Sequence, residues 1–160
     1  MEIIEYDKKY LEDVKDLLTE LEEYIVSIDE DNLDHVHENY REEMVNYCFK
    51  DVNDNNGKCF IAVEDDKAIG LIMGFDRKYE DKDYLDYKCP KMGIVGELIV
   101  SKKSRSKAIG TKLMNKMEEY FKSIGCEYVL ISVFAYNKNA INFYSKFGYH
   151  PRMLDMIRKL

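Results

Sequence analysis

A basic turn between two apolar segments is the part of this chain with the clearest chemical use. Before it, Ile94–Val100 predicts a short buried strand. After it, apolar residues recur at spacings of three and four and predict a helix: Ile109, Leu113, Met117, Phe121 and Ile124. A turn that leads into a helix exposes unpaired backbone N–H groups and the positive end of the helix dipole. Four basic side chains add positive charge around this turn: Lys102, Lys103, Arg105 and Lys107. The segment therefore predicts an anion site, and phosphate is the usual anion at such a place.

Small residues in the same turn favour a bulky anion. Ser106, Ala108 and Gly110 leave room for a diphosphate to approach the backbone. The alternative is an ordinary surface turn that has collected lysines. The patterns G-x-x-x-x-G-K-[ST] and G-x-G-x-x-G are both absent, which argues against P-loop hydrolysis and Rossmann dinucleotide binding. A pyrophosphate cradle of another kind is the functional prediction.

A second patterned segment runs from Ala135 to Tyr149. Its marked residues are Asn137, Ala140, Phe143-Tyr144 and Gly148-Tyr149. Together with the run Arg105–Gly110, it resembles the GNAT superfamily of acyl-CoA-dependent N-acetyltransferases. The signatures of that family are Arg/Gln-x-x-Gly-x-Gly/Ala at a helix start, then Asn-x-x-Ala, Phe/Leu-Tyr and Gly-Phe/Tyr. The resemblance is strongest from about Val95 to Tyr149. It departs at Ala108, where the family usually has glycine, and we expect the turn to survive with less room for phosphate.

The resemblance implies acetyl-CoA as the co-substrate and no metal. It places the coenzyme on the following residues: Leu98, Ile99, Val100, Arg105, Ser106, Lys107, Ala108, Ile109, Gly110, Thr111, Asn137 and Tyr144. The first three would offer backbone groups to the pantetheine arm, as an added strand pairs with a sheet edge. In the family the asparagine that matches Asn137 bonds to the coenzyme arm. Asn137 also suits a helix N-cap, and the two roles are compatible.

Amine acetylation needs one group that takes the ammonium proton and another that protonates the leaving sulfur. The resemblance makes Tyr144 the candidate acid, because the matching tyrosine points its hydroxyl at the sulfur of the coenzyme. The alternative is a tyrosine packed in the core beside Phe143 and Phe147. Glu97 is the candidate base, as the only ionisable residue within Ile94–Val100, where apolar neighbours would raise its pKa. The alternative is a side chain that faces solvent or a lysine.

Two acidic stretches favour a cationic acceptor. One lies between Ser27 and Glu43, and the other, Tyr79–Lys91, is also rich in tyrosine. Such surfaces suit a polyamine, an aminoglycoside, a basic peptide or a lysine side chain. The alternative is a solvated acidic face that maintains solubility. We therefore expect an N-acetyltransferase for a small cationic amine. The other readings are a protein N-terminal or lysine acetyltransferase, a non-catalytic CoA-binding regulatory module, and an interaction protein of similar topology.

Composition argues against several other classes. The chain has 160 residues and a net charge of −7, so it repels nucleic acid overall and we expect no such partner. No apolar run approaches the ~18 residues of a membrane span, and no signal-peptide pattern is present, which predicts a cytoplasmic protein without membrane contact. Widely separated cysteines and only three histidines argue against a zinc site. Cys59 and Cys126 are expected to be buried, reduced thiols.

The order of elements predicts an α/β fold in which residues 1–160 form a single N-acetyltransferase domain. The resemblance implies a mixed, mostly antiparallel sheet of about six or seven strands with about four flanking helices. A splayed parallel strand pair would then form the acetyl-CoA site, and a homodimer is a further expectation. The expected strands are Glu2–Glu5, Cys59–Glu64, Ala68–Phe75, Ile94–Val100, Glu127–Ala135 and Tyr149–Lys159. The expected helices are Asp7–Val26, Leu33–Phe49, Ile109–Ser123 and Lys138–Phe147.

Overall fold

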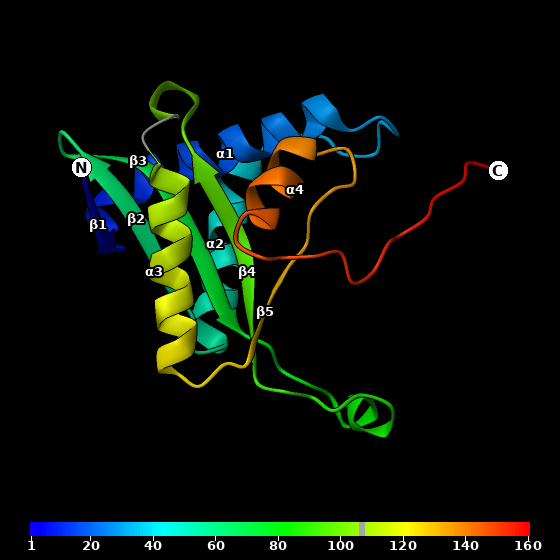
Figure 1. The fold of residues 1–160 in the computed structure, drawn as a ribbon. Helices are drawn as coiled ribbons and strands as arrows, with labels where there is room; N and C mark the ends of the chain where they lie inside the picture. The colour runs from blue at the N-terminus through cyan, green and yellow to red at the C-terminus, as the bar shows by residue number, and fades with distance from the viewer. Residues whose placement is uncertain (106–107) are drawn as a thin grey trace.

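A central sheet of five strands carries helices on both faces in the computed structural model (Figure 1). The model describes residues 1–105 and 108–160. The strands are β1 (Glu2–Glu5), β2 (Lys58–Glu64), β3 (Lys67–Asp76), β4 (Met92–Val100) and β5 (Tyr128–Ile131). The helices are α1 (Leu11–Ile28), α2 (Tyr40–Asp54), α3 (Ile109–Ser123) and α4 (Lys138–Ser145). Short 3-10 turns occur at η1 (Lys8–Tyr10), η2 (Asp81–Leu85) and η3 (Lys102–Ser104).

The strands follow the order β1-β2-β3-β4-β5 across the sheet. The pairs β1–β2, β2–β3 and β3–β4 are antiparallel, and the pair β4–β5 is parallel. The predicted hairpin across Asp65–Lys67 is confirmed, with Glu64 opposite Lys67. This sequential order means that β4 and β5 lie at one side of the sheet, joined by the crossover through α3 (Figure 1).

Alternation along the strands divides the core into two layers. Ile61, Leu71 and Met73 face α1 and α2 on one side. Phe60 and Ile72 face α3 on the other side. The predicted helical stripe is confirmed for four of its five members, which are between 0% and 2% exposed: Ile109, Leu113, Met117 and Phe121. The fifth, Ile124, is the C-cap of α3 and is only half-buried. Each such side chain contributes about 1.5–3 kcal/mol of burial free energy, so α3 is held firmly against the sheet.

Gly93 on β4 marks the closest approach of α3 to the sheet. A Cβ atom at this position would lie 2.6 Å from Cγ and Cδ1 of Phe121. Gly93→Ala is therefore expected to lower the free energy of unfolding by about 1–3 kcal/mol, the usual cost of overpacking, as measured by urea denaturation. Gly110→Ala is the matched control, since its nearest contact would be 3.4 Å from Cζ of Phe143. Equal stability of Gly93→Ala and the wild type would mean that α3 sits further from β4 than described.

The parallel pair separates half-way along β4. Only Met92–Val95 pairs with β5, opposite Tyr128–Ile131. The second half of β4 still pairs with β3, through Leu98, Ile99 and Val100. On its other side, the chain after β5 turns away toward α4 (Figure 1). The expected splayed pair is therefore confirmed, and it leaves one edge of β4 open.

The sheet is smaller than expected because the chain beyond residue 148 forms no strand. Residues 149–160 are described as irregular, and all but Tyr149 are exposed. The reason is visible in the sequence, where apolar pairs such as Met153-Leu154 and Met156-Ile157 give no alternation for one buried face. Residues 127–135 were also expected to be buried on both faces, and this is wrong. Only Tyr128–Ile131 is extended in the sheet, and Tyr128 is 59% exposed.

Helix boundaries also differ. The first helix, expected at Asp7–Val26, is α1, Leu11–Ile28, and the last, expected at Lys138–Phe147, ends at Ser145. The second helix was expected at Leu33–Phe49 and is instead α2, Tyr40–Asp54. The cause is Asp29, whose carboxylate accepts backbone N–H groups from Asp31, Leu33 and Asp34 and holds that segment as a loop. Cys59 is buried as expected, whereas Cys126 is only half-buried.

Candidate active site

A β-bulge at Gly96 decides where Glu97 points. Met73 pairs with Glu97 and the next residue, Gly74, pairs with Val95, so Gly96 is an extra residue in β4. Val95 accordingly packs with the α3 layer, while Glu97 lines a cavity on the α2 face. Two residues that strict alternation would put on one face therefore lie on opposite faces. The bulge sits where β4 loses its pairing with β5.

Glu97 is half-buried and only weakly hydrogen-bonded. Its Oε1 accepts from the thiol of Cys48 at a distance of 3.9 Å. Burial, and to a smaller extent the negative charge of Glu22, raise the pKa of Glu97 to about 7, against the opposing effect of the Cys48 hydrogen bond. A carboxyl group with this pKa exchanges its proton readily at neutral pH, which is the property needed in a general base.

Tyr144 comes from α4, on the other side of the open edge. Its ring lies 5.3 Å from that of Phe143 and 6.0 Å from that of Tyr149. Burial raises the pKa of Tyr144 to about 12, and the charge of Glu97 adds to the shift. The hydroxyl therefore keeps its proton at neutral pH, as a general acid requires. Tyr144 therefore packs in the core and is also close enough to Glu97 for that charge to affect its pKa.

Asn137 caps α4 and is oriented from α1. Its Oδ1 accepts the backbone N–H of Ala140 at 3.1 Å and the hydroxyl of Tyr24 at 3.3 Å. With Oδ1 occupied twice, the amide NH2 group is the part available to a ligand. The ring of Tyr24 also lies under the guanidinium of Arg105, at 5.6 Å. Tyr24 thus links α1 to both sequence segments of the expected coenzyme site, and no sequence signal marked it.

Tyr24→Phe is expected to raise the dissociation constant for acetyl-CoA about three- to tenfold and to change kcat little. Phenylalanine keeps the ring beneath Arg105 but removes the hydrogen bond that orients Asn137. Calorimetric titration and steady-state kinetics give the two quantities. Tyr136→Phe is the matched control, because its hydroxyl bonds to Asp31 instead. An unchanged dissociation constant in Tyr24→Phe would contradict this role.

The connection from β4 to α3 has the features of an anion site. Its first residues are anchored by Glu20 of α1, whose carboxylate accepts the Lys102 backbone N–H at 2.6 Å and the Ser101 hydroxyl at 3.2 Å. Arg105 follows, and its Nε donates to the carbonyl of Val100 at 3.4 Å. Two predicted coenzyme residues, Ser106 and Lys107, lie outside the described residues.

Helix α3 begins immediately beyond this connection. Ala108 adopts a left-handed conformation with φ 55°, which the glycine usual in the family takes without strain. Ile109, Gly110 and Thr111 form the first turn of α3, and their N–H groups have no partner within the helix. This end of α3 is therefore suited to a phosphate group.

The two acidic stretches are largely engaged in structural contacts. Asp29 organises its own loop, and Glu42 pairs with Lys15 at 2.6 Å and with Arg41 at 2.9 Å. The tyrosine-rich stretch projects away from the sheet with η2 (Figure 1). Within residues 1–105 and 108–160, no cluster of potential metal ligands occurs. In the same ranges, no helix is long and apolar enough to cross a bilayer.

Comparison with known families decides the affiliation. Residues 12–149 match the Acetyltransferase (GNAT) family. The chain belongs to that family. Acetyltransferases of this family use acetyl-CoA.

Individual relatives agree with this assignment. An uncharacterized N-acetyltransferase of Methanocaldococcus jannaschii is 32% identical over 98 residues, which cover 60% of this chain and 55% of that protein. The match thus spans about half the length of that relative. A tetramutant of a Bacillus halodurans protein has a TM-score of 0.82 at 18% identity, with 100% of both chains covered. An aminoglycoside N-acetyltransferase in complex with CoA has a TM-score of 0.68 at 16% identity, with 99% of both chains covered. At such identities the solved structures establish the shared fold.

Within the GNAT fold, the predicted residues converge from distant parts of the sequence. The charge of Glu97 on β4 reaches Tyr144 on α4, and Tyr24 contacts both Asn137 and Arg105. Sequence reasoning missed Glu22, Tyr24 and Cys48. These residues lie on α1 and α2 and act on the site only through tertiary contacts.

Proposed function

We propose that this chain moves an acetyl group from acetyl-CoA to the primary amine of a small cationic molecule, by direct transfer in a ternary complex. The observation that carries the proposal is that Glu97, on the α2 face of β4, acts electrostatically on Tyr144, which packs with the α3 layer, and that their pKa values suit a base and an acid. The coenzyme arm is assigned to the backbone of Leu98, Ile99 and Val100, and the pyrophosphate to the N-terminus of α3.

Each chemical step has a residue to serve it. Glu97 accepts a proton from the bound ammonium, which frees the nitrogen lone pair to attack the thioester carbonyl carbon. As the tetrahedral adduct collapses, its nitrogen gives its remaining excess proton to solvent, the carbon–sulfur bond breaks, and Tyr144 donates its hydroxyl proton to the departing thiolate. Tyr144 is reprotonated from solvent, Glu97 releases its proton, and the products are an N-acetyl amine and free CoA. Alignment of the two reactants supplies much of the rate.

Other features support the setting of this reaction. Residues 1–160 are taken as one acetyltransferase domain. The four free thiols, Cys48, Cys59, Cys89 and Cys126, suit the reducing cytoplasm. A homodimer through the exposed apolar residues of the C-terminal segment, such as Leu154 and Ile157, is part of the proposal.

Titration with acetyl-CoA, followed by a free-thiol assay over a panel of amines, tests the proposal. Wild-type protein is expected to bind acetyl-CoA and to release CoA with at least one amine class. Gly110→Asp is expected to lose binding, because its carboxylate would stand at the α3 N-terminus in place of a phosphate. Binding without release on any small amine or peptide would favour the non-catalytic module. Release only on peptides would favour a protein acetyltransferase.

A further inference from the structure

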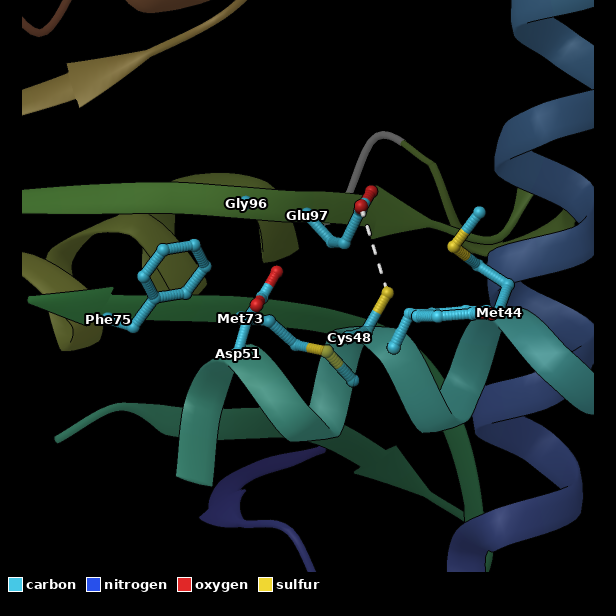
Figure 2. A pocket seen from close by; sticks show the side chains of 8 residues that line it. Met44, Cys48, Asp51, Met73, Phe75, Gly96 and Glu97 are labelled. Carbon is cyan, nitrogen blue, oxygen red and sulfur yellow. Dashed lines mark hydrogen bonds between the residues drawn. The ribbon is translucent and has the colours of Figure 1, made fainter. Parts of the chain in front are cut away.

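One face of α2 closes a cavity beside Glu97. Met44, Tyr47, Cys48 and Asp51 follow the spacing i, i+3, i+4, i+7 and share that face. With Met73, Phe75, Gly96 and Glu97 from β3 and β4, they line a space of about 140 Å³ (Figure 2). A cavity of this size has room for a short aliphatic chain.

Two carboxylates line this cavity outside the ion pairs of α2. Among the described residues, the Glu97 carboxylate has only the thiol of Cys48 as a hydrogen-bond partner, and the side chain of Asp51 forms no hydrogen bond or ion pair, although its charge helps to raise the pKa of Lys50. On the same helix, Asp54 pairs with Lys50 at 2.6 Å, and Glu42 pairs with Lys15. The cavity therefore offers two carboxylates to a cationic ligand.

Apolar side chains separate the two carboxylates. Figure 2 shows Glu97 extending from β4 at one end, next to Cys48, and Asp51 rising from α2 at the other end, near Phe75. Met73 lies on the cavity wall between them. The Cys48 thiol is close to both carboxylates, since the charges of Glu97 and Asp51 both raise its pKa. Along the cavity, the Glu97 carboxylate is therefore followed by an apolar wall and then by the Asp51 carboxylate.

We propose that the acceptor is an aliphatic diamine or the diamine end of a polyamine, and that Asp51 selects it by binding the second ammonium group. This inference rests on the proposed acetyl transfer and names its substrate class. The reacting amine lies at Glu97, the methylene chain lies against Met73 and Phe75, and the distal ammonium lies at Asp51. A monoamine would leave the Asp51 carboxylate without a partner, so the second charge supplies the discrimination.

Matched amines test the assignment in a free-thiol assay. Wild-type kcat/KM for 1,4-diaminobutane is expected to exceed that for butylamine, its singly charged analogue, by about tenfold or more. Asp51→Asn is expected to reduce this ratio about three- to tenfold through the KM of the diamine, because it removes one exposed ion pair. Glu43→Gln, at an exposed acid of α2 that does not line the cavity, is the control that should keep the ratio.

The outcomes separate this inference from the function on which it rests. If butylamine or another monoamine gave CoA release at a rate equal to that of the diamine, the diamine assignment would be overturned, and acetyl transfer would remain. A ratio that Asp51→Asn leaves intact would likewise remove Asp51 as the selecting residue. Acetyl-CoA binding with no release on any amine would overturn both proposals. Circular dichroism melting of Asp51→Asn would show that the exposed substitution leaves the fold intact.

Discussion

Replacing Glu97 by glutamine is expected to lower kcat by about 10²–10⁴-fold at neutral pH, the usual contribution of a positioned acid–base group. Glutamine preserves the size of the side chain and its place beside Cys48, and it removes the ability to accept a proton. Steady-state kinetics with saturating acetyl-CoA measure the loss. The affinity for acetyl-CoA, measured by calorimetry, should stay near the wild-type value, because Glu97 faces the α2 cavity.

The wild-type rate is expected to rise with pH through a midpoint near the pKa of Glu97, about 7. Only the deprotonated carboxylate can take the ammonium proton, so activity increases as pH passes that value. Of the groups around it, Cys48 from α2 and Tyr144 from α4 have pKa values of about 12, and the pKa of Tyr40 is raised further. The carboxylate whose charge raises the pKa of Glu97 is Glu22 from α1, and Glu22→Gln should move the midpoint to lower pH by removing this like charge.

The pH dependence of the free energy of unfolding gives an independent measure of the raised pKa of Glu97. The pKa of Glu97 is raised on folding from 4.5 to about 7, so the folded protein holds its proton more tightly than the unfolded chain. Stability therefore falls as pH rises from 4.5 to about 7, and the loss is complete above that range. Glu97→Gln should be more stable than the wild type at pH 8 by about 1–2 kcal/mol, with no gain at pH 4. A flat rate profile in the wild type, or normal turnover in Glu97→Gln, would assign the base role to another group.

Local periodicity predicted the elements that depend on near neighbours. The stripe of α3, the β2–β3 hairpin and the cap at Asn137 all follow from residues a few positions apart, and the structure has them. The last helix ends at Ser145, before the expected Phe147, and Gly148 takes a left-handed φ of 87° in the turn that follows. Such features are predictable because their energetics are mostly local.

The orientation of Glu97 was beyond sequence reasoning. Counting along β4 puts Val95 and Glu97 on one face, and the bulge at Gly96 puts them on opposite faces. That bulge exists only through the pairing of β4 with β3, a contact between strands distant in sequence. The same limitation hid Tyr24 and Cys48, whose roles arise when α1 and α2 pack beside the open edge.

The C-terminal strand failed for a different reason. The residues of 152–160 do not alternate, and they are exposed in the structure. A strand buried on one face needs a period of two, so pattern should have outweighed composition in that segment.

Replacing Tyr144 by phenylalanine is expected to lower kcat by about 10²-fold or more and to change the acetyl-CoA dissociation constant by about twofold or less. Phenylalanine keeps the ring contacts with Phe143 and Tyr149, and loses only the hydroxyl that would protonate the sulfur. Pre-steady-state and steady-state thiol release provide the rates. Tyr149→Phe is the matched control, since it removes a hydroxyl that donates to Glu118 from the neighbouring ring of the same cluster.

A change in the pKa of the Tyr144 hydroxyl distinguishes a role as proton donor from a role in packing alone. With a pKa of about 12, the hydroxyl remains protonated throughout the stable range of most proteins, so the wild type should show no alkaline fall in rate from this group. A ring-fluorinated tyrosine at position 144 keeps the shape of the side chain and lowers its pKa. If Tyr144 donates the proton, that variant should acquire an alkaline limb, because the deprotonated phenolate has no proton to give. If the ring only packs, both the fluorinated variant and Tyr144→Phe should retain the wild-type rate profile, and the proton for the leaving thiolate must then come from water at the open edge of β4.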